Sequence, residues 1–285
     1  MKTNYPDNFC GLTEEFSNYE NSRIVILPVP FDETTSWIKG SDKGPQAIID
    51  ASRQLELYDI ETKTEVYRHG IFTTDEIIAR GSPDMIGKVY ENVKKFLDDG
   101  KFVVTIGGEH PVCIGSIKAH SEKFPGMYVL QLDAHTDMRD SYEGSMYSHA
   151  STMSRVKEIV PGIISVGIRS MDITEVERVN PENIFYAHDI VKSENWIRPV
   201  IDKLPDNVYI TIDVDVFDPG IMPSTGTPEP GGLDWHQVID LMAEIAEKKN
   251  ITGFDVTELC PSDNRAPDFL AAKLIYKILT YKFSP

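Results

Sequence analysis

The chain has 285 residues, of which 41% are hydrophobic, and carries a formal net charge of −17. This length suits one large α/β domain or two small ones, and the hydrophobic content is enough for a sizeable core, which argues against disorder. The acidic balance argues against nucleic acid and anionic membrane as partners, since both need basic patches on the protein.

The apolar segments and the cysteines of the sequence indicate the cellular compartment that we expect for the protein. Residues 1–20 have no apolar segment of the kind that a secretory signal needs. No apolar run approaches the roughly 18 residues of a membrane-spanning helix. Cys10, Cys113 and Cys260 are widely spaced and form no CxxC pair. These features predict a cytoplasmic protein with buried free thiols.

Short β-rich runs alternate with segments of helical periodicity along the chain. This alternation predicts a parallel sheet with helices on both faces, in which continuous apolar strands are buried on both sides. The predicted helices end in Gly or in Lys, Lys and Asn, which are helix C-terminal signals. In chain order, the predicted elements are strand 23–30, helix 83–100, strands 102–108, 128–135, 163–169 and 208–216, helix 233–250 and strand 251–259.

Side chains that can bind metal come directly after three of the predicted strands. In open α/β sheets, ligands bind at the edge where the carboxyl ends of the strands meet. The sequence therefore predicts that one edge of the sheet collects Glu109, His110, Asp133, His135, Asp137, Asp213 and Asp215.

The spacing of these residues is regular. Asp133, His135 and Asp137 stand at positions i, i+2 and i+4. An extended backbone would point these three side chains to one side, and the same spacing applies to Asp213 and Asp215. A single DxD motif is equally consistent with helix or loop capping. Three clusters that each follow a strand favour metal binding.

The predicted ligand set indicates the kind of metal site. Four carboxylates and two imidazoles, with no thiolate, favour Mn²⁺, Mg²⁺ or a similar ion over structural zinc. Six ligands are too many for one catalytic ion that must keep an open coordination position. They suit two ions that share bridging carboxylates.

Eight motifs occur along the chain, namely SWIKGSDKGPQAIIDAS (36–52), GGEH (107–110), LDAHTDMRD (132–140), SHAS (148–151), SVGIRS (165–170), DVDVFDP (213–219), GTPEPGGL (226–233) and DVTELCP (255–261). In this combination and order they resemble the ureohydrolase family, the arginase and agmatinase group. The resemblance implies one domain over residues 1–285, with a three-layer α/β/α fold around a mainly parallel eight-stranded sheet. It also implies a homotrimer or homohexamer.

The resemblance further implies two Mn²⁺ ions per subunit, with Asp133 and Asp213 as bridging ligands. One ion would be held by His110, Asp133, Asp137 and Asp213, and the other by Asp133, His135, Asp213 and Asp215.

Three residues are predicted to be catalytic by the same resemblance. Asp137 would accept a hydrogen bond from the nucleophile and pass on its proton, and His149 in YSHAST would shuttle protons to the leaving amine. Glu258 would orient the guanidinium, because a carboxylate accepts two parallel hydrogen bonds from that group. Ala150 departs mildly from the family's pattern after the histidine. Glu109 replaces the aspartate of GGDH and is predicted to support His110.

The implied reaction is hydrolysis of a guanidino group to urea and an amine. Neutral water attacks a guanidinium very slowly. A dinuclear metal site lowers the pKa of bound water, so that hydroxide is available as the nucleophile near neutral pH. The GTPEPGG turn, with Glu229, is similar to that of agmatinase-like members, and an acidic site edge suits a distal ammonium. Agmatine, giving putrescine for polyamine biosynthesis, is therefore the first expectation.

Other substrates and functions remain open. Aminopropylagmatine fits equally well, whereas arginine and guanidinobutyrate carry a carboxylate for which Arg139 is the candidate partner. A one-zinc deacetylase or polyamine amidohydrolase of the same fold would lack the His110 ligand. An inactive binding homologue would have lost a ligand, His149 or Glu258. Asp255 is predicted to support the site, and His69, His120, His188 and His236 to be surface or packing residues.

Overall fold

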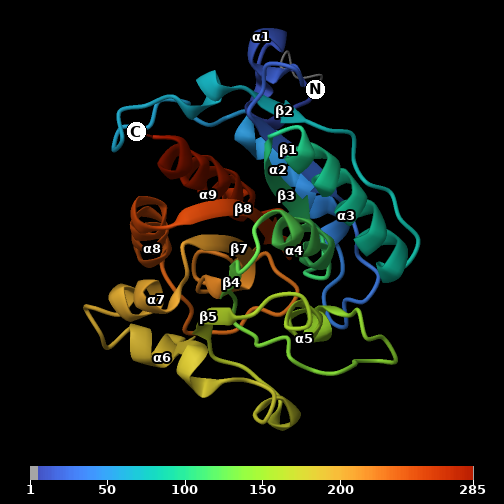
Figure 1. Ribbon diagram of the computed structural model, residues 1–285, viewed down its shortest axis with the longest axis vertical. Helices are drawn as coiled ribbons and strands as arrows, with labels where there is room; N and C mark the ends of the chain where they lie inside the picture. Colours follow the sequence, from blue (N-terminus) through green and yellow to red (C-terminus); the bar gives the residue numbers. More distant parts are fainter. Residues whose placement is uncertain (1–5, 285) are drawn as a thin grey trace.

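A computed structural model describes residues 6–284. Within this range, eight strands form one parallel sheet at the centre of the molecule (Figure 1). The strands are β1 (Ile24–Val29), β2 (Ile71–Thr73), β3 (Phe102–Gly107), β4 (Tyr128–Leu132), β5 (Ile163–Ile168), β6 (Ile184–Tyr186), β7 (Asn207–Asp213) and β8 (Asn250–Thr257). Their order across the sheet is β2-β1-β3-β8-β7-β4-β5-β6.

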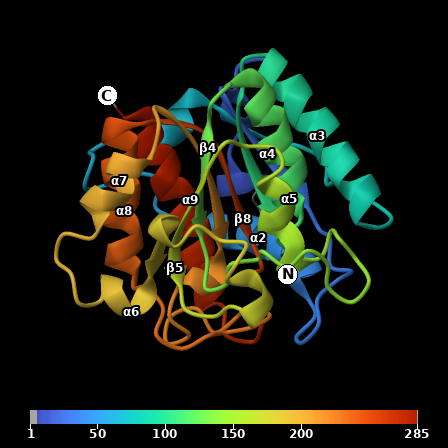
Figure 2. The same cartoon turned by 60° about the horizontal axis from the view of Figure 1, so that its bottom comes forward.

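Helices cover both faces of this sheet, which gives the predicted three-layer α/β/α fold (Figure 2). Among the helices within residues 6–284, none combines the length and the apolarity that crossing a membrane requires. The helices are α1 (Glu14–Ser17), α2 (Gly44–Ser52), α3 (Ser82–Asp98), α4 (Val112–Lys123), α5 (Thr152–Val156), α6 (Ala187–Ile190), α7 (Ile197–Lys203), α8 (Trp235–Lys248) and α9 (Ala266–Phe283).

The sheet is apolar on both sides because each face has its own core. In β1, Ile24 and Ile26 point into the core shared with α2, α6, α7, α8 and α9. Val25 and Leu27 point to the opposite side, toward α3 and α4. Period-2 alternation of two apolar sets is the reason that the strand is a continuous apolar run.

The two predicted helices follow their capping and periodicity signals. In α3, the residues buried at helical spacing include Met85, Val89 and Val93. The helix α8 begins at a capping box, in which Asp234 accepts from the backbone of Gln237 and the Gln237 side chain accepts in return. Both helices therefore pack one apolar face on the sheet.

The structure differs from the predicted strands in two respects. The strands β4 and β7 end at Leu132 and Asp213, each three residues earlier than the apolar runs predict. The edge strands β2 and β6, of three residues each, carry no distinctive pattern and were not predicted. The four central strands, β3, β8, β7 and β4, end beside one another, so the residues that follow them meet at one edge of the sheet.

A glycine in β8 lets the helix α4 approach the sheet. A Cβ atom built on Gly253 would lie 2.2 Å from Nε2 of His120, so only glycine leaves room for this ring. The ring is fully buried, packs 4.8 Å from that of Tyr209, and shares a 2.8 Å hydrogen bond with the carbonyl of Ser116. Its Nε2 has no hydrogen-bond partner within residues 6–284. His120 is thus a packing residue, as predicted.

His120 makes stability sensitive to acid. Burial lowers the pKa of His120 from 6.5 to about 4. Between these values the unfolded chain binds the additional proton, so stability rises with pH and is lost as the pH falls from about 6.5 toward 4. We expect this residue alone to lower the free energy of unfolding by about 2 kcal/mol between pH 7.5 and pH 5.

Urea unfolding of the wild type and of His120→Gln at both pH values measures this effect, because glutamine stays neutral. The pH-dependent loss should be smaller in His120→Gln by about 2 kcal/mol. His236→Gln, which changes an exposed histidine on α8, is the control and should behave as the wild type does. Equal pH dependence in all three proteins would contradict the expectation.

Candidate metal centre and catalytic site

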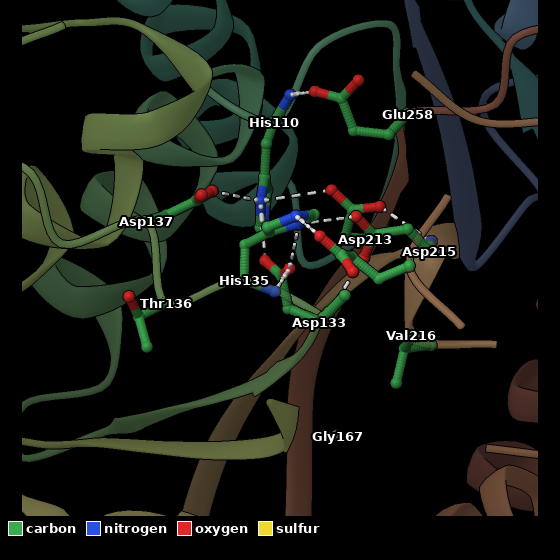
Figure 3. Close-up of polar contacts among 12 residues, drawn as sticks. His110, Asp133, His135, Thr136, Asp137, Gly167, Asp213, Asp215, Val216 and Glu258 are labelled. Carbon is green, nitrogen blue, oxygen red and sulfur yellow. Dashed lines mark hydrogen bonds and ion pairs between the residues drawn. The ribbon is translucent and has the colours of Figure 1, made fainter. Parts of the chain in front are cut away.

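The residues that follow the four central strands converge on one point (Figure 3). His110 lies in the turn between β3 and α4, and Asp133 follows β4 directly. Asp213 is the last residue of β7, and Glu258 follows β8. Parallel strands bring these chain ends together although they are up to about 150 positions apart, as in the hydrogen bond that spans 148 positions between His110 N and Glu258 Oε1.

A first group of ligand atoms surrounds the ring of His110. Its Nδ1 lies 3.0 Å from Oδ2 of Asp137, 3.3 Å from Oδ2 of Asp133 and 3.8 Å from Oδ2 of Asp213. His110, Asp133 and Asp213 each offer one atom within 4.8 Å of the others, and all three are buried. This group has the size and the donor types of a metal site.

A second group shares Asp133 with the first. Nδ1 of His135 lies 2.8 Å from Oδ2 of Asp215 and 3.7 Å from Oδ1 of Asp133. These three residues also offer ligand atoms within 4.8 Å of one another. Since the two oxygens of Asp133 face different histidines, this carboxylate joins the two groups.

The side chains converge through turns and not through an extended backbone. The chain bends at Ala134, and Asp137 adopts a left-handed conformation with φ of 52°. Asp213 caps the 3₁₀ turn η7 (Val214–Val216), where its Oδ1 accepts from the backbone N–H of Asp215 at 2.8 Å. The prediction that these side chains lie together is confirmed, but the predicted cause, an extended backbone with alternating side chains, is wrong.

Burial of so many acids raises their pKa values. The pKa of Asp133 is raised by burial and then by the charge of Asp215, and that of Asp213 is raised for the same two reasons. Burial, and then the charge of Asp133, raises the pKa of Asp137 to about 7. Burial and mutual repulsion therefore make ionisation of these carboxylates less favourable than in water.

The pKa values of the two histidines are also raised, although burial acts on them in the opposite sense. Burial would lower the pKa of His135, but the charge and hydrogen bond of Asp215 and the charges of Asp133 and Asp137 outweigh it and raise the pKa to about 10. The cluster thus attracts positive charge at its centre. Its oxygen and imidazole donors, buried and aimed at common points, fit a pair of divalent cations.

Neighbouring groups hold the ligands in these orientations. Nε2 of His110 is 2.9 Å from Oγ1 of Thr211, which donates to Oδ1 of Asp255 at 2.8 Å. Asp255 thereby supports His110 through the threonine, as predicted. Gln131 donates to Oδ2 of Asp133 at 2.9 Å. A second layer of this kind fixes ring and carboxylate orientation before a metal binds.

The other two predicted catalytic residues line the cavity above this cluster. Glu258 has a left-handed backbone with φ of 66°, and its Oε1 accepts from the backbone N–H of His110 at 2.7 Å. The ring of His149 packs edge-on against Tyr142, and its Nδ1 has no hydrogen-bond partner within residues 6–284. Every residue predicted for the site thus reaches one place. The cavity, of about 250 Å³, is lined in part by His135, Asp137, His149, Asp213, Asp215 and Glu258.

The cavity also has lining residues that were not predicted to be catalytic or metal-binding. Trp37, with an indole 76% exposed, and Tyr142 contribute aromatic surface. Arg139 is engaged within the wall, since its guanidinium lies 4.8 Å from the centre of the Tyr142 ring and 3.4 Å from Asp172. Glu175 accepts from the backbone N–H of Met138 at 2.7 Å and so anchors the loop after the metal motif. Trp37 and Arg139 lie inside motifs that resemble the family's, and this position was the signal in the sequence that could have placed them at the cavity.

The side-chain contacts of Glu109 differ from those expected of a residue that supports His110. Its carboxylate turns away from His110 toward Thr34 and Thr35, whose backbone N–H groups donate to Oε1 at 2.5 and 2.9 Å. Within residues 6–284 the Glu109 carboxylate has no hydrogen bond to His110, and the expectation that Glu109 tunes this ligand stays a prediction. Side-chain direction in this turn depends on a loop some 75 positions away, which the motif itself does not reveal.

Known proteins resemble the chain over almost its full length. An N(1)-aminopropylagmatine ureohydrolase of Synechocystis is 38% identical, over 98% of this chain and 95% of that protein. An agmatinase of Bacillus anthracis is 36% identical, over 86% of both chains. The solved structure of the agmatine ureohydrolase of Thermoplasma volcanium has a TM-score of 0.85 and 30% identity, over 97% of this chain and 94% of that one.

The match to a family agrees with these similarities. The description of the arginase family fits residues 22–280, a range that includes every strand and all the site residues described above. By its sequence match and its eight-stranded parallel sheet, the chain belongs to the arginase family.

Proposed function

We propose that the chain is a dinuclear-metal ureohydrolase that cleaves the guanidino group of a small cationic amine to urea and an amine. The observation that carries the proposal is the pair of histidine–carboxylate groups joined by Asp133 at the floor of an acid-lined cavity. Membership of the arginase family supports the same reaction class. The presence of His110, His149 and Glu258 argues against a one-zinc amidohydrolase and an inactive homologue.

The proposed metal is manganese, two ions per subunit, because the donors are carboxylates and imidazoles without a thiolate. Divalent cations held in such a site lower the pKa of water and so supply the nucleophile for hydrolysis. The residues that would hold them are His110, Asp133, His135, Asp137, Asp213 and Asp215.

The chain's own residues would bind the substrate and move its protons. The Glu258 carboxylate, at the cavity wall, would accept two hydrogen bonds from the planar guanidinium and hold it over the cluster. Asp137 would accept a proton from the nucleophile. His149 would carry a proton to the leaving amine, a role for which its unpartnered Nδ1 and its place in the cavity wall are suited.

The pKa of His149 matters to this role. Burial, assisted by the charges of neighbouring groups, lowers it to about 4, so the ring is neutral near pH 7. A neutral ring accepts a proton on one nitrogen and releases it again, as a shuttle requires.

The proposed substrate is N(1)-aminopropylagmatine, with agmatine as the second candidate. Relatives named for the former reaction are 34% to 38% identical to this chain, and an agmatinase reaches 36%. Hydrolysis by one water molecule converts N(1)-aminopropylagmatine to spermidine and urea, and agmatine to putrescine and urea. Either activity would serve polyamine biosynthesis.

The cavity favours an amine over a carboxylate at the far end of the substrate. Among residues 6–284, Arg139 is the arginine that lines the cavity, and it is held by Asp172 and by the ring of Tyr142. Asp172 and Glu175 add negative charge to the lining. A substrate carboxylate would meet this charge without an unengaged lysine or arginine from the described residues, so arginine and guanidinobutyrate fit the cavity less well.

We further propose that residues 1–285 form one catalytic domain, that the protein is a homotrimer or homohexamer, and that it works in the cytoplasm. The family match over residues 22–280 supports a single domain, and the absence of an extended apolar helix within residues 6–284 is compatible with that compartment.

The reaction and its substrate are tested together by a urea assay on purified protein. With Mn²⁺ supplied, we expect urea from N(1)-aminopropylagmatine and from agmatine. The value of kcat/KM for arginine and guanidinobutyrate should be at least roughly a hundredfold lower, because a carboxylate would be left unpaired in the cavity. A chelator should stop the reaction. Urea from none of the four substrates would overturn the proposal.

The metal count is tested by substitution of one ligand. His135→Ala should lose one of two bound Mn²⁺ ions and most of the activity, because this ring belongs to the second group only. Metal analysis by mass spectrometry measures the ratio, and His236→Ala, on the exposed face of α8, is the matched control. Two ions retained in His135→Ala would contradict the assignment.

Glu258→Gln tests substrate orientation apart from metal binding. The amide keeps the size and an oxygen for the His110 N–H but loses one charged acceptor. Charge-assisted hydrogen bonds are worth about 1.5–3 kcal/mol, so kcat/KM should fall by roughly 10- to 100-fold. Metal content should remain that of the wild type. A loss of metal instead would assign Glu258 to the metal site.

A further inference from the structure

A buried acid joins two loops of the cavity to the end of β3. Glu109 is fully buried, and its carboxylate accepts the backbone N–H groups and the side-chain hydroxyls of both Thr34 and Thr35. Thr35, with its neighbours Ser36 and Trp37, lines the cavity. Glu109 directly precedes His110 in the chain. Its contacts therefore fix one wall of the cavity close to this candidate metal ligand.

The hydroxyl of Thr34 extends this link to a second loop. Oγ1 donates its hydrogen to Oε2 of Glu109, because a carboxylate only accepts. The lone pairs of the same oxygen are then free to accept, and they accept from the backbone N–H of His149 at 3.2 Å. One hydroxyl thus connects Glu109 to the loop that carries the proposed proton carrier.

The backbone around His149 is held by this contact and by the carbonyl of Ala150, which accepts from the backbone N–H of Arg139 at 3.0 Å. Its Nδ1 has no hydrogen-bond partner within residues 6–284, and an edge-on packing contact with Tyr142 is weaker than a hydrogen-bonded anchor. The loop itself spans exposed residues such as Glu143, Met146 and Tyr147. The position of the ring over the cavity is therefore set largely by where the backbone of His149 is held.

We infer that Glu109 is a positioning residue that acts through Thr34 to fix His149 and the cavity wall at 34–37 relative to the metal cluster. This inference rests on the proposed function, because a fixed His149 matters for turnover only if it carries a proton. Neither Glu109 nor Thr34 touches the substrate in this role. Their effect is on the geometry of the residues that do.

The test compares Thr34→Val, Thr34→Ser and Thr35→Val. Valine has the shape of threonine without the hydroxyl, so Thr34→Val removes the link to His149, whereas Thr34→Ser keeps it. Thr35→Val is the matched control, since the Thr35 hydroxyl contacts Glu109 at 3.2 Å but is not bonded to His149. Glu109→Asp, one methylene shorter, should loosen both loops.

Two measurements read the variants. Hydrogen–deuterium exchange by mass spectrometry should be several-fold faster over residues 141–151 in Thr34→Val and unchanged there in Thr34→Ser and Thr35→Val. In turnover, Thr34→Val should lower kcat by about tenfold with little change in KM, which is part of the 10²–10⁴-fold that a proton carrier contributes. The content of Mn²⁺ should be unchanged in all three.

The outcomes are distinct. Unchanged exchange over 141–151 in Thr34→Val would overturn the inference whatever happens to kcat. An equally large increase in exchange over 141–151 in Thr35→Val would overturn it too. Faster exchange with an unchanged kcat would overturn the catalytic part. A wild-type protein that releases no urea would overturn the proposed function instead, while the exchange measurement would still test the link from Thr34 to His149.

Discussion

The concentration of buried carboxylates at one edge of the sheet is the constraint on which the remainder of the structure depends. Like charges in a medium of low polarity repel strongly and are costly to ionise. Two imidazoles lie among the acids, and the shared carboxylate of Asp133 faces both of them. Such an arrangement is stable only where cations or protons neutralise part of the negative charge. The cluster therefore needs positive charge and also holds its donor atoms in a fixed geometry around the place where that charge would bind.

The parallel sheet is what makes that geometry possible. The strands β3, β8, β7 and β4 are buried on both faces, so their ends are held by the two cores and do not move independently. The residues that leave these ends come from distant parts of the sequence. A rigid frame of this kind keeps buried polar groups in place, whereas the loops above it remain free to differ among relatives that act on different amines.

Much of this could be predicted from the sequence, for identifiable reasons. Long apolar runs predicted the six longer strands, because a buried parallel strand has to be apolar on both sides. The edge strands β2 and β6 are too short to carry a pattern. The candidate metal ligands were predicted because each cluster follows a strand. The direction of the Glu109 side chain was not predicted, because contacts with the distant residues Thr34 and Thr35 determine it.

The left-handed backbones of Asp137 and Glu258 have a consequence for the stability of the site. A residue other than glycine in that conformation costs about 1 kcal/mol or more, which the surrounding fold has to absorb. Glycine at either position would relax the main chain while removing an acid to which the proposed mechanism assigns a role. Each of these two positions therefore sets backbone stability against the side chain that the proposed chemistry needs.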